Sequence, residues 1–194
     1  MKACILMASP RQAGNTAQLL RPFQAELEAG GWEIGLIRLY DRQIGPCLAC
    51  LACRACQRDW TGFGCPQQDD MGEIFDAVLA CDLLVLATPI YSWYCTAPMK
   101  AALDRLVYGM NKFYGGEKGP ALWAGKRVAL IATCGYPPER GADLWEAGMI
   151  RYCKHSQLLY EGMLAERQRR YDEPFMDQGK QARARAFARK LMGR

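Results

Sequence analysis

The sequence predicts a single α/β domain built on a doubly wound parallel sheet of five strands, with helices on both faces. Short, almost wholly apolar runs alternate with segments of helical periodicity, and such runs are typical of strands buried on both faces. Strands that alternate with helices pair in parallel through right-handed crossovers. The chain has 194 residues, 51% of them hydrophobic, which is enough for one core over residues 1–194. We expect the strand order 2-1-3-4-5, which places a ligand site at the carboxyl edge, between the first and third strands.

The first three elements form a strand, a helix and a second strand. Residues 2–7 are an apolar run, as expected of a buried strand. Residues 15–28 carry apolar side chains at helical spacing, and the pair Gly30-Gly31 ends that helix. Residues 32–39 have a β-like pattern, which predicts the second strand.

A long cysteine-rich loop follows, at about residues 41–68. Asp70 is the expected N-cap of a helix over residues 71–80, and Glu73 stands at the third position, as in a capping box. The loop therefore separates the second strand from the second long helix.

The third strand is predicted at residues 83–87, another short apolar run. Thr96 is the expected cap of a helix that begins near Pro98, because the first turn of a helix is a favoured place for proline. The glycine-rich stretch 108–125 is predicted to be a loop.

The last part of the chain repeats the alternation of strand and helix. The predicted elements are a buried strand at 127–133, a helix at 139–154, a strand at 158–164 and a final helix at 177–192. These elements complete the five strands of the expected sheet.

Charge and hydropathy indicate whether the chain binds nucleic acid or a membrane. The net charge is +5, and basic residues gather at helical spacing after Gly162. A solvated helix face is favoured over a nucleic-acid surface, since no nucleic-acid motif accompanies them. No apolar run approaches the roughly 18 residues of a membrane helix. The opening residues are interpreted as a strand and not as a signal peptide, so we expect a cytoplasmic protein with reduced thiols and with no membrane or nucleic-acid partner.

The side chains offer little support for acid–base or nucleophilic catalysis. The chain has one histidine, His155, which is expected near the end of a helix at the surface. A Ser-His-Asp or Cys-His mechanism therefore has no support, and no pair of carboxylates stands out. The chemistry must come from a cofactor.

The loop after the first strand has the groups that a phosphate needs. Ser9 and Thr16 supply hydroxyls, Asn15 an amide and Arg11 a charged fork, while Gly14 permits close approach of the backbone. The start of the next helix adds unpaired N–H groups and the positive end of its dipole. The alternative is an ordinary strand-to-helix turn. The loop matches neither a Walker A motif nor the dinucleotide motif G-x-G-x-x-G.

The loop after the third strand is rich in aromatic residues. Tyr91, Trp93 and Tyr94 could lie beside a flat ring, and backbone N–H groups could face the polar edge of that ring. The alternative is an aromatic loop packed for structural reasons.

Ten cysteines are unevenly distributed along the chain. Five are scattered and are expected to be small core residues. The others crowd the long loop, at Cys47, Cys50, Cys53, Cys56 and Cys65. The spacing of the first three is compatible with a [4Fe–4S] ligand run, with Cys56 or Cys65 as the fourth ligand. Structural or redox-labile thiols and a zinc site are the alternatives.

Several segments carry a resemblance to a known family. SPRQAGNT, beginning at Ser9, and TPIYSWYCTAPMKAALDR, beginning at Thr88, resemble the flavodoxin-like NAD(P)H-dependent FMN reductases and their relatives, the iron–sulfur flavoproteins. The loop TCGY, beginning at Thr133, resembles the third flavin-contacting segment of the family, and the cysteine run ahead of Asp69-Asp70-Met71 is similar to that of the iron–sulfur flavoproteins. The chain has Ala8 where the family often has glycine. The resemblance implies a flavodoxin-like fold and FMN contacts at Ser9, Arg11, Gln12, Gly14, Asn15, Thr16, Thr88, Pro89, Ile90, Tyr91, Ser92, Trp93, Thr133, Gly135 and Tyr136.

The resemblance also implies a function. We expect an FMN-dependent oxidoreductase that passes electrons from NAD(P)H to a small acceptor, such as a quinone, a nitro compound, a flavin or a metal centre. No side chain is expected to be catalytic, because N5 of the flavin carries the chemistry. A homodimer or homotetramer is expected by analogy.

Two other functions stay open. One is an iron–sulfur flavoprotein electron carrier that ferredoxin reduces. The other is a module that binds a different phosphate ligand. Lys100, Asp104 and Arg105 match a helix signature of the family, and an exposed helix with ion pairs is an equal interpretation of these three residues.

Overall fold

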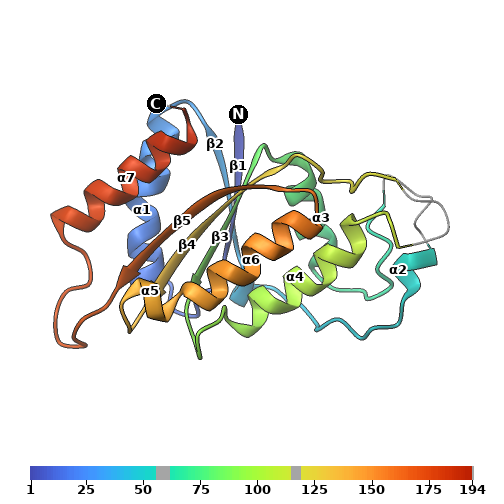
Figure 1. The fold of residues 1–194 in the computed structure, drawn as a ribbon, viewed down its shortest axis with the longest axis horizontal. Helices are drawn as coiled ribbons and strands as arrows, with labels where there is room; N and C mark the ends of the chain where they lie inside the picture. The colour runs from blue at the N-terminus through green and yellow to red at the C-terminus, as the bar shows by residue number, and fades with distance from the viewer. Residues whose placement is uncertain (56–61, 115–118, 194) are drawn as a thin grey trace.

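The fold is a five-stranded parallel sheet in the order β2-β1-β3-β4-β5, as predicted. The computed structural model describes residues 1–55, 62–114 and 119–193. Neighbouring strands are rotated relative to one another, so that in Figure 1 the twisted sheet is seen with its strands spread at different angles. Their bounds are Lys2–Met7 (β1), Glu33–Arg38 (β2), Leu83–Pro89 (β3), Arg127–Cys134 (β4) and Leu159–Arg167 (β5).

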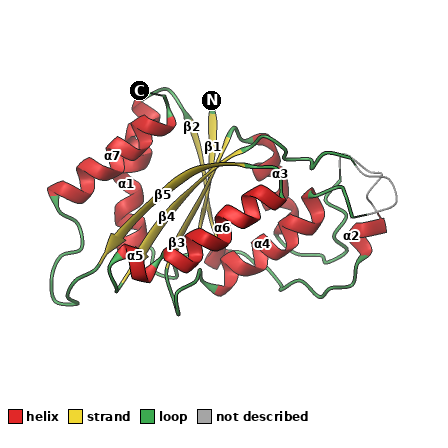
Figure 2. Ribbon diagram, in the orientation of Figure 1, coloured by secondary structure: helices red, strands yellow, loops and turns green. Residues whose placement is uncertain are grey.

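Helices cover both faces of the sheet (Figure 2). One face is covered by α1 and α7, which pack against each other, and the other by α3, α4 and α6. The helices are α1 (Asn15–Ala29), α2 (Ala52–Ala55), α3 (Met71–Ala80), α4 (Ala97–Met110), α5 (Pro138–Gly141), α6 (Asp143–His155) and α7 (Gln178–Leu191), with a 3-10 turn at Leu39–Asp41.

The side chains of β1 point alternately into the two layers of the core, one on each face of the sheet. Ala3, Ile5 and Met7 belong to the cluster under α1 and α7, and Cys4 and Leu6 belong to the opposite cluster. Because successive side chains of a strand point to opposite faces, a strand buried on both sides has to be apolar throughout. This explains why the run at residues 2–7 was recognisable in the sequence.

Several boundaries differ from the prediction. The helix expected at 139–154 is two helices, α5 and α6, and α4 extends to Met110, into the expected loop at 108–125. A Cβ atom at Gly109 would lie 2.2 Å from the ring of Phe63. The glycine therefore admits the returning end of the cysteine-rich loop against α4, and it does not end the helix.

Asp70 and Thr96 are the N-cap residues of α3 and α4, as predicted, but neither side chain bonds the first turn of its helix. The carboxylate of Asp70 accepts the N–H of Gln43 at 2.7 Å, while its neighbour Asp69 accepts the N–H of Met71 at 3.2 Å. The hydroxyl of Thr96 donates to the carbonyl of Ala8 at 2.9 Å. Tertiary partners have displaced the local ones.

The basic residues of α7 pack against acidic partners. Arg189 lies 2.9 Å and Arg185 3.7 Å from the carboxylate of Glu26 on α1. Arg183 forms a 2.5 Å ion pair with Glu166 at the end of β5. In the ranges that the structure describes, no helix has the length and apolar character needed to span a bilayer.

Candidate active site at the carboxyl edge of the sheet

A cavity of about 700 Å³, here called the edge cavity, lies at the carboxyl ends of the strands. Arg11, from the loop after β1, and Tyr91, from the loop after β3, both line it. The two loops that the sequence singled out therefore share one pocket. Of the residues expected to contact a flavin, the structure places in its wall Arg11, Asn15, Pro89, Ile90, Tyr91, Ser92, Trp93, Thr133, Gly135 and Tyr136.

The remaining predicted contacts lie outside the cavity wall: Ser9, Gln12, Gly14, Thr16 and Thr88. Thr16 is buried, and its hydroxyl shares a 2.8 Å hydrogen bond with that of Thr133. Thr88 is also buried, donates to the carbonyl of Pro89 at 2.8 Å and accepts the N–H of Thr96 at 3.3 Å. The two threonines hold the loops around the cavity in position.

The start of α1 is open to an anion. Gly14 is its N-cap and supplies no side chain, so no side-chain acceptor satisfies the first N–H groups of the helix. Helix N-termini of this kind bind phosphates. In the parts of the chain that the structure describes, no carboxylate pairs with the nearby guanidinium of Arg11. Both features leave positive charge at this end of the cavity.

A tight hairpin presents Trp93 at the other end. Tyr91 and Tyr94 exchange two backbone hydrogen bonds, of 2.9 and 3.0 Å, around Ser92 and Trp93. Ser92 has φ 50° and Trp93 has φ 63°, so both central residues lie in the left-handed region that this type of turn requires and that usually selects asparagine or glycine. Strain of this kind gathers at functional sites.

The aromatic rim of the cavity is half exposed. Trp93 stacks on Tyr136, with ring centroids 5.9 Å apart and planes at 14°. The exposed fractions of Tyr91, Trp93 and Tyr136 are 51%, 48% and 60%. Flat apolar surfaces therefore face solvent beside the cavity, where a planar ring could cover them.

Backbone donors stand beside these rings. Within the described residues, the N–H groups of Ser92, Trp93, Gly135 and Tyr136 have no protein acceptor. Unpaired donors of this kind need water or a ligand. They suit the polar edge of a heterocycle.

A segment after β5 completes the wall, and sequence reasoning missed it. The further lining residues are Gln18, Cys134, Gly141, Gln168, Tyr171, Glu173, Pro174 and Phe175. The carboxyl end of β5 shares its edge with β1, β3 and β4, so the topology was the signal that could have indicated Gln168.

Cys134 is a neutral group in this wall. Burial raises the pKa of its thiol to about 11, and its Sγ atom lies 3.2 Å from the carbonyl oxygen of Tyr136. At neutral pH the thiol is protonated.

The cysteine-rich loop forms a second site, beside α4. Cys47, Cys50, Cys53 and Cys65 line one small cavity of about 80 Å³, here called the cysteine cavity. Burial raises the pKa of Cys53, and so do its neighbours Cys65, Cys47 and Cys50. Cys56 lies outside the described residues. Every cysteine that the structure describes is a free thiol, and no three metal-ligating side chains among the described residues converge as an ion would need.

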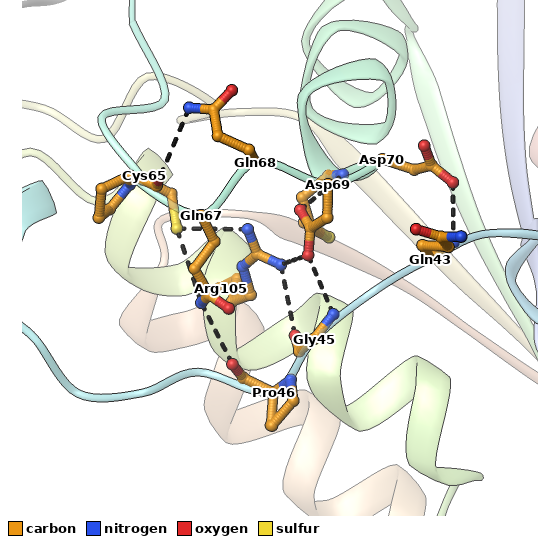
Figure 3. A network of polar contacts seen from close by, with 11 residues as sticks. Gln43, Gly45, Pro46, Cys65, Gln67, Gln68, Asp69, Asp70 and Arg105 are labelled. Atoms are coloured by element: carbon orange, nitrogen blue, oxygen red, sulfur yellow. Dashed lines mark hydrogen bonds and ion pairs between the residues drawn. The ribbon is translucent and has the colours of Figure 1, made fainter.

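Arg105 holds this loop to α4 (Figure 3). Its guanidinium lies within hydrogen-bonding distance of the carboxylate of Asp69, and it lies 3.3 Å from both the carbonyl of Gly45 and the sulfur of Cys65. Burial alone would raise the pKa of Asp69, but the hydrogen bonds from Arg105 and from the N–H groups of Gly45 and Met71 outweigh it and lower that pKa.

The interpretation of Arg105 as part of an exposed ion-paired helix is wrong. Its side chain is 1% exposed. The interpretation fits Lys100 and Asp104, which form an exposed ion pair of 2.6 Å one turn apart. The helix signature thus combines an exposed ion pair, Lys100 with Asp104, and a buried arginine, Arg105, that holds the cysteine-rich loop to α4.

Comparisons with known proteins agree with this geometry. Residues 1–141 match the family described as NADPH-dependent FMN reductase. An "Iron-sulfur flavoprotein" of Archaeoglobus fulgidus is 33% identical over 140 residues, 72% of this chain and 58% of that protein. Another of that name, from Methanosarcina thermophila, is 30% identical over 127 residues, 64% of this chain and 63% of the relative. The matches span less than two thirds of these relatives.

Solved structures share the fold over almost the whole chain. An NAD(P)H:quinone oxidoreductase from Methanothermobacter marburgensis has a TM-score of 0.76 at 19% identity, covering 98% of this chain and 96% of that one. An FMN-dependent NADH-azoreductase from Bacillus anthracis, in complex with FMN, has a TM-score of 0.71 at 15% identity, covering 98% and 99%. At these identities the likeness concerns the fold.

Proposed function

Because this chain belongs to the NADPH-dependent FMN reductase family, we propose that its edge cavity holds FMN and that it passes electrons from NAD(P)H to a small acceptor. The observation that carries the proposal is the shared cavity of Arg11 and Tyr91, about 700 Å³ in volume. A cationic end for a phosphate and an aromatic end for a ring thereby face one space.

The residues at the first end would anchor the phosphate of FMN. Arg11 supplies a guanidinium fork and Asn15 an amide, beside the open N-terminus of α1. Charge-assisted hydrogen bonds to phosphate are about twice as strong as neutral ones. Ser9, Gly14 and Thr16 would not contact the phosphate themselves. They would fix the shape of the loop that carries Arg11 and Asn15.

The residues at the second end would position the ring. Tyr91, Trp93 and Tyr136 offer apolar surface, and the free N–H groups beside them offer donors. When bound, FMN would supply hydride acceptance and electron transfer. The small acceptor is a quinone, a nitro compound, a free flavin or a metal centre.

No side chain of the edge cavity is proposed as an acid or base. The thiol of Cys134 is protonated at neutral pH. His155 ends α6 and contacts the hydroxyl of Tyr114 at 2.5 Å, and neither residue lines the edge cavity. The protein would bind and orient the cofactor, which supplies the reactivity.

The proposal is tested on the purified protein. A flavin absorption spectrum is expected, and mixing with NADPH or NADH should bleach it within one turnover. A colourless protein that takes up no FMN would overturn the proposal and favour a different phosphate ligand.

A second candidate is an electron carrier that ferredoxin reduces, with a [4Fe–4S] cluster in the cysteine loop. The support is the set of four cysteines that line one cavity, since thiolates are the ligands of such clusters. Cys47, Cys50 and Cys53 would be ligands, with Cys65 or Cys56 as the fourth.

Metal analysis after anaerobic purification tests the cluster. Iron and sulfide in stoichiometric amounts, lost in Cys65→Ser or in Cys56→Ser, would support it and identify the fourth ligand. Metal-free protein would exclude it. Flavin that ferredoxin reduces, and that neither nucleotide bleaches, would favour the carrier over the reductase.

We also propose a homodimer or homotetramer in the cytoplasm. Trp93, Tyr136 and the fully exposed Tyr171 lie around the edge cavity, where a second copy could cover them. Free thiols throughout the described residues are typical of a reducing compartment. Light scattering coupled to gel filtration measures the assembly.

A further inference from the structure

A second cavity, of about 510 Å³, adjoins the edge cavity. It lies between the end of β5 and the start of α7, and we call it the arginine cavity. The two cavities share Gln168, Glu173, Pro174 and Phe175 as walls. One elongated ligand could therefore extend through both.

Two of the cations in the arginine cavity are already neutralised. Arg183 lies 2.5 Å from the carboxylate of Glu166, and Lys180 lies 2.9 Å from that of Asp177. Asp177 also caps α7 by accepting the N–H of Lys180, so the N-terminus of this helix is not open to an anion.

The other two cations have no carboxylate partner among the described residues. Arg167 donates only to the carbonyl of Gly135, at 2.9 Å. Arg169 is exposed, lines the cavity and has no hydrogen bond or ion pair in the described part of the chain. The third acidic residue of the wall, Glu173, lies 3.6 Å from Arg170, which is not in the wall. The cavity thus has two guanidinium groups available for an anion.

We propose that the arginine cavity binds the phosphates of the nicotinamide dinucleotide, with Arg167 and Arg169 as the phosphate ligands. The inference rests on the proposed function, because the nicotinamide end would extend past Gln168 into the edge cavity. Guanidinium groups suit phosphate through their planar fork of donors. The phosphate bound is either the pyrophosphate, which NADH and NADPH share, or the 2′-phosphate of NADPH.

Calorimetric titration tests the site without electron transfer. The probes are ADP-ribose, which has the pyrophosphate, and 2′-phospho-ADP-ribose, which has both groups. Arg169→Gln should weaken binding of at least one probe by roughly five-fold or more, as expected for a charge-assisted hydrogen bond. Weakening of both probes identifies the pyrophosphate, and weakening of the second alone identifies the 2′-phosphate.

Arg185→Gln is the matched control. It removes the same charge from an exposed position of α7, where the side chain lies 3.7 Å from the carboxylate of Glu26 and outside the cavity wall. It should change either affinity less than two-fold. Equal affinities in Arg169→Gln and Arg185→Gln, or no binding of either probe to the unmodified protein, would overturn the site.

The readouts separate this proposal from the proposed function. Failure to retain FMN would count against the function, and the probes would still report on the cavity. Retention of FMN and its bleaching by nucleotide, with no difference between the two variants, would overturn the arginine cavity alone.

Discussion

The side-chain amide of Asn15, at the start of α1, donates a 3.1 Å hydrogen bond to the side-chain oxygen of Gln168, just after β5. The amide of Gln168 in turn donates to the carbonyl of Arg170 and, at 3.1 Å, to that of Glu173. Gln168 therefore fastens the C-terminal segment to the phosphate loop. It also forms part of the wall between the two cavities.

Gln168→Ala should weaken binding of FMN by roughly five- to ten-fold, because three hydrogen bonds that close the cavity are lost. Gln181→Ala, at an exposed position of α7, is the control and should bind FMN normally. Quenching of flavin fluorescence measures both affinities. Equal affinities in the two variants would mean that the segment after β5 does not contribute to the site.

Ser92→Asn should stabilise the protein by about 0.5–1 kcal/mol, because asparagine tolerates the left-handed region better than serine. The φ of 50° at Ser92 is the reason for this expectation. Urea unfolding of the FMN-free protein measures the change, because bound ligand would itself shift the midpoint. A lower midpoint in Ser92→Asn than in the unmodified chain would show that the turn is not strained at this residue.

Acid should weaken the anchor between Asp69 and Arg105. The pKa of Asp69 lies below its ordinary value of 3.8 in the folded chain, so the unfolded chain binds this proton first as the pH falls. The stabilisation is complete above that ordinary value and is lost as the pH falls through the folded pKa. Between about pH 5 and pH 2.5, the midpoint of urea unfolding should therefore decline less for Asp69→Asn than for the unmodified chain. Parallel declines would contradict the assignment.

Alkali should destabilise the fold through its buried thiols. Burial raises the pKa of Cys134 to about 11 and those of Cys95 and Cys153 to about 12. Unfolded thiols ionise near an ordinary value of 9.0, so the native state binds more protons above it and stability falls as the pH rises. Cys134→Ala should show a smaller loss between about pH 9 and 11 in urea titrations. An unchanged slope would indicate that this thiol ionises freely in the folded protein.

The elements that the sequence predicted best are those with local causes. The strand Lys2–Met7 and the helix Met71–Ala80 have their predicted bounds, because burial on both faces and helical periodicity are visible in consecutive residues. The N-cap positions of Asp70 and Thr96 were predicted as well, but their side chains bond Gln43 and Ala8, which are distant in sequence.

The position of residues at the edge cavity could be predicted where consecutive residues of one loop line it. Residues 89–93 all line the edge cavity, since a turn after a parallel strand lies at the ligand edge. Thr88, one residue earlier, faces the interior. The contributions of Gln168 and Arg105 depend on contacts with segments far away in the chain, at Asn15 and Asp69, and no local pattern indicates those contacts.

The most direct test of the central claim compares FMN with riboflavin, which lacks the phosphate. The unmodified protein should bind FMN at least ten-fold more tightly, as roughly 1.4 kcal/mol from the phosphate contacts requires. Arg11→Ala combined with Asn15→Ala should abolish this preference, while the riboflavin affinity should fall by no more than roughly five-fold, through loss of the Asn15–Gln168 hydrogen bond. Gln12→Ala, in the same loop but outside the cavity wall, should keep the preference. An undiminished preference for FMN in the double variant would contradict the shared pocket for phosphate and ring.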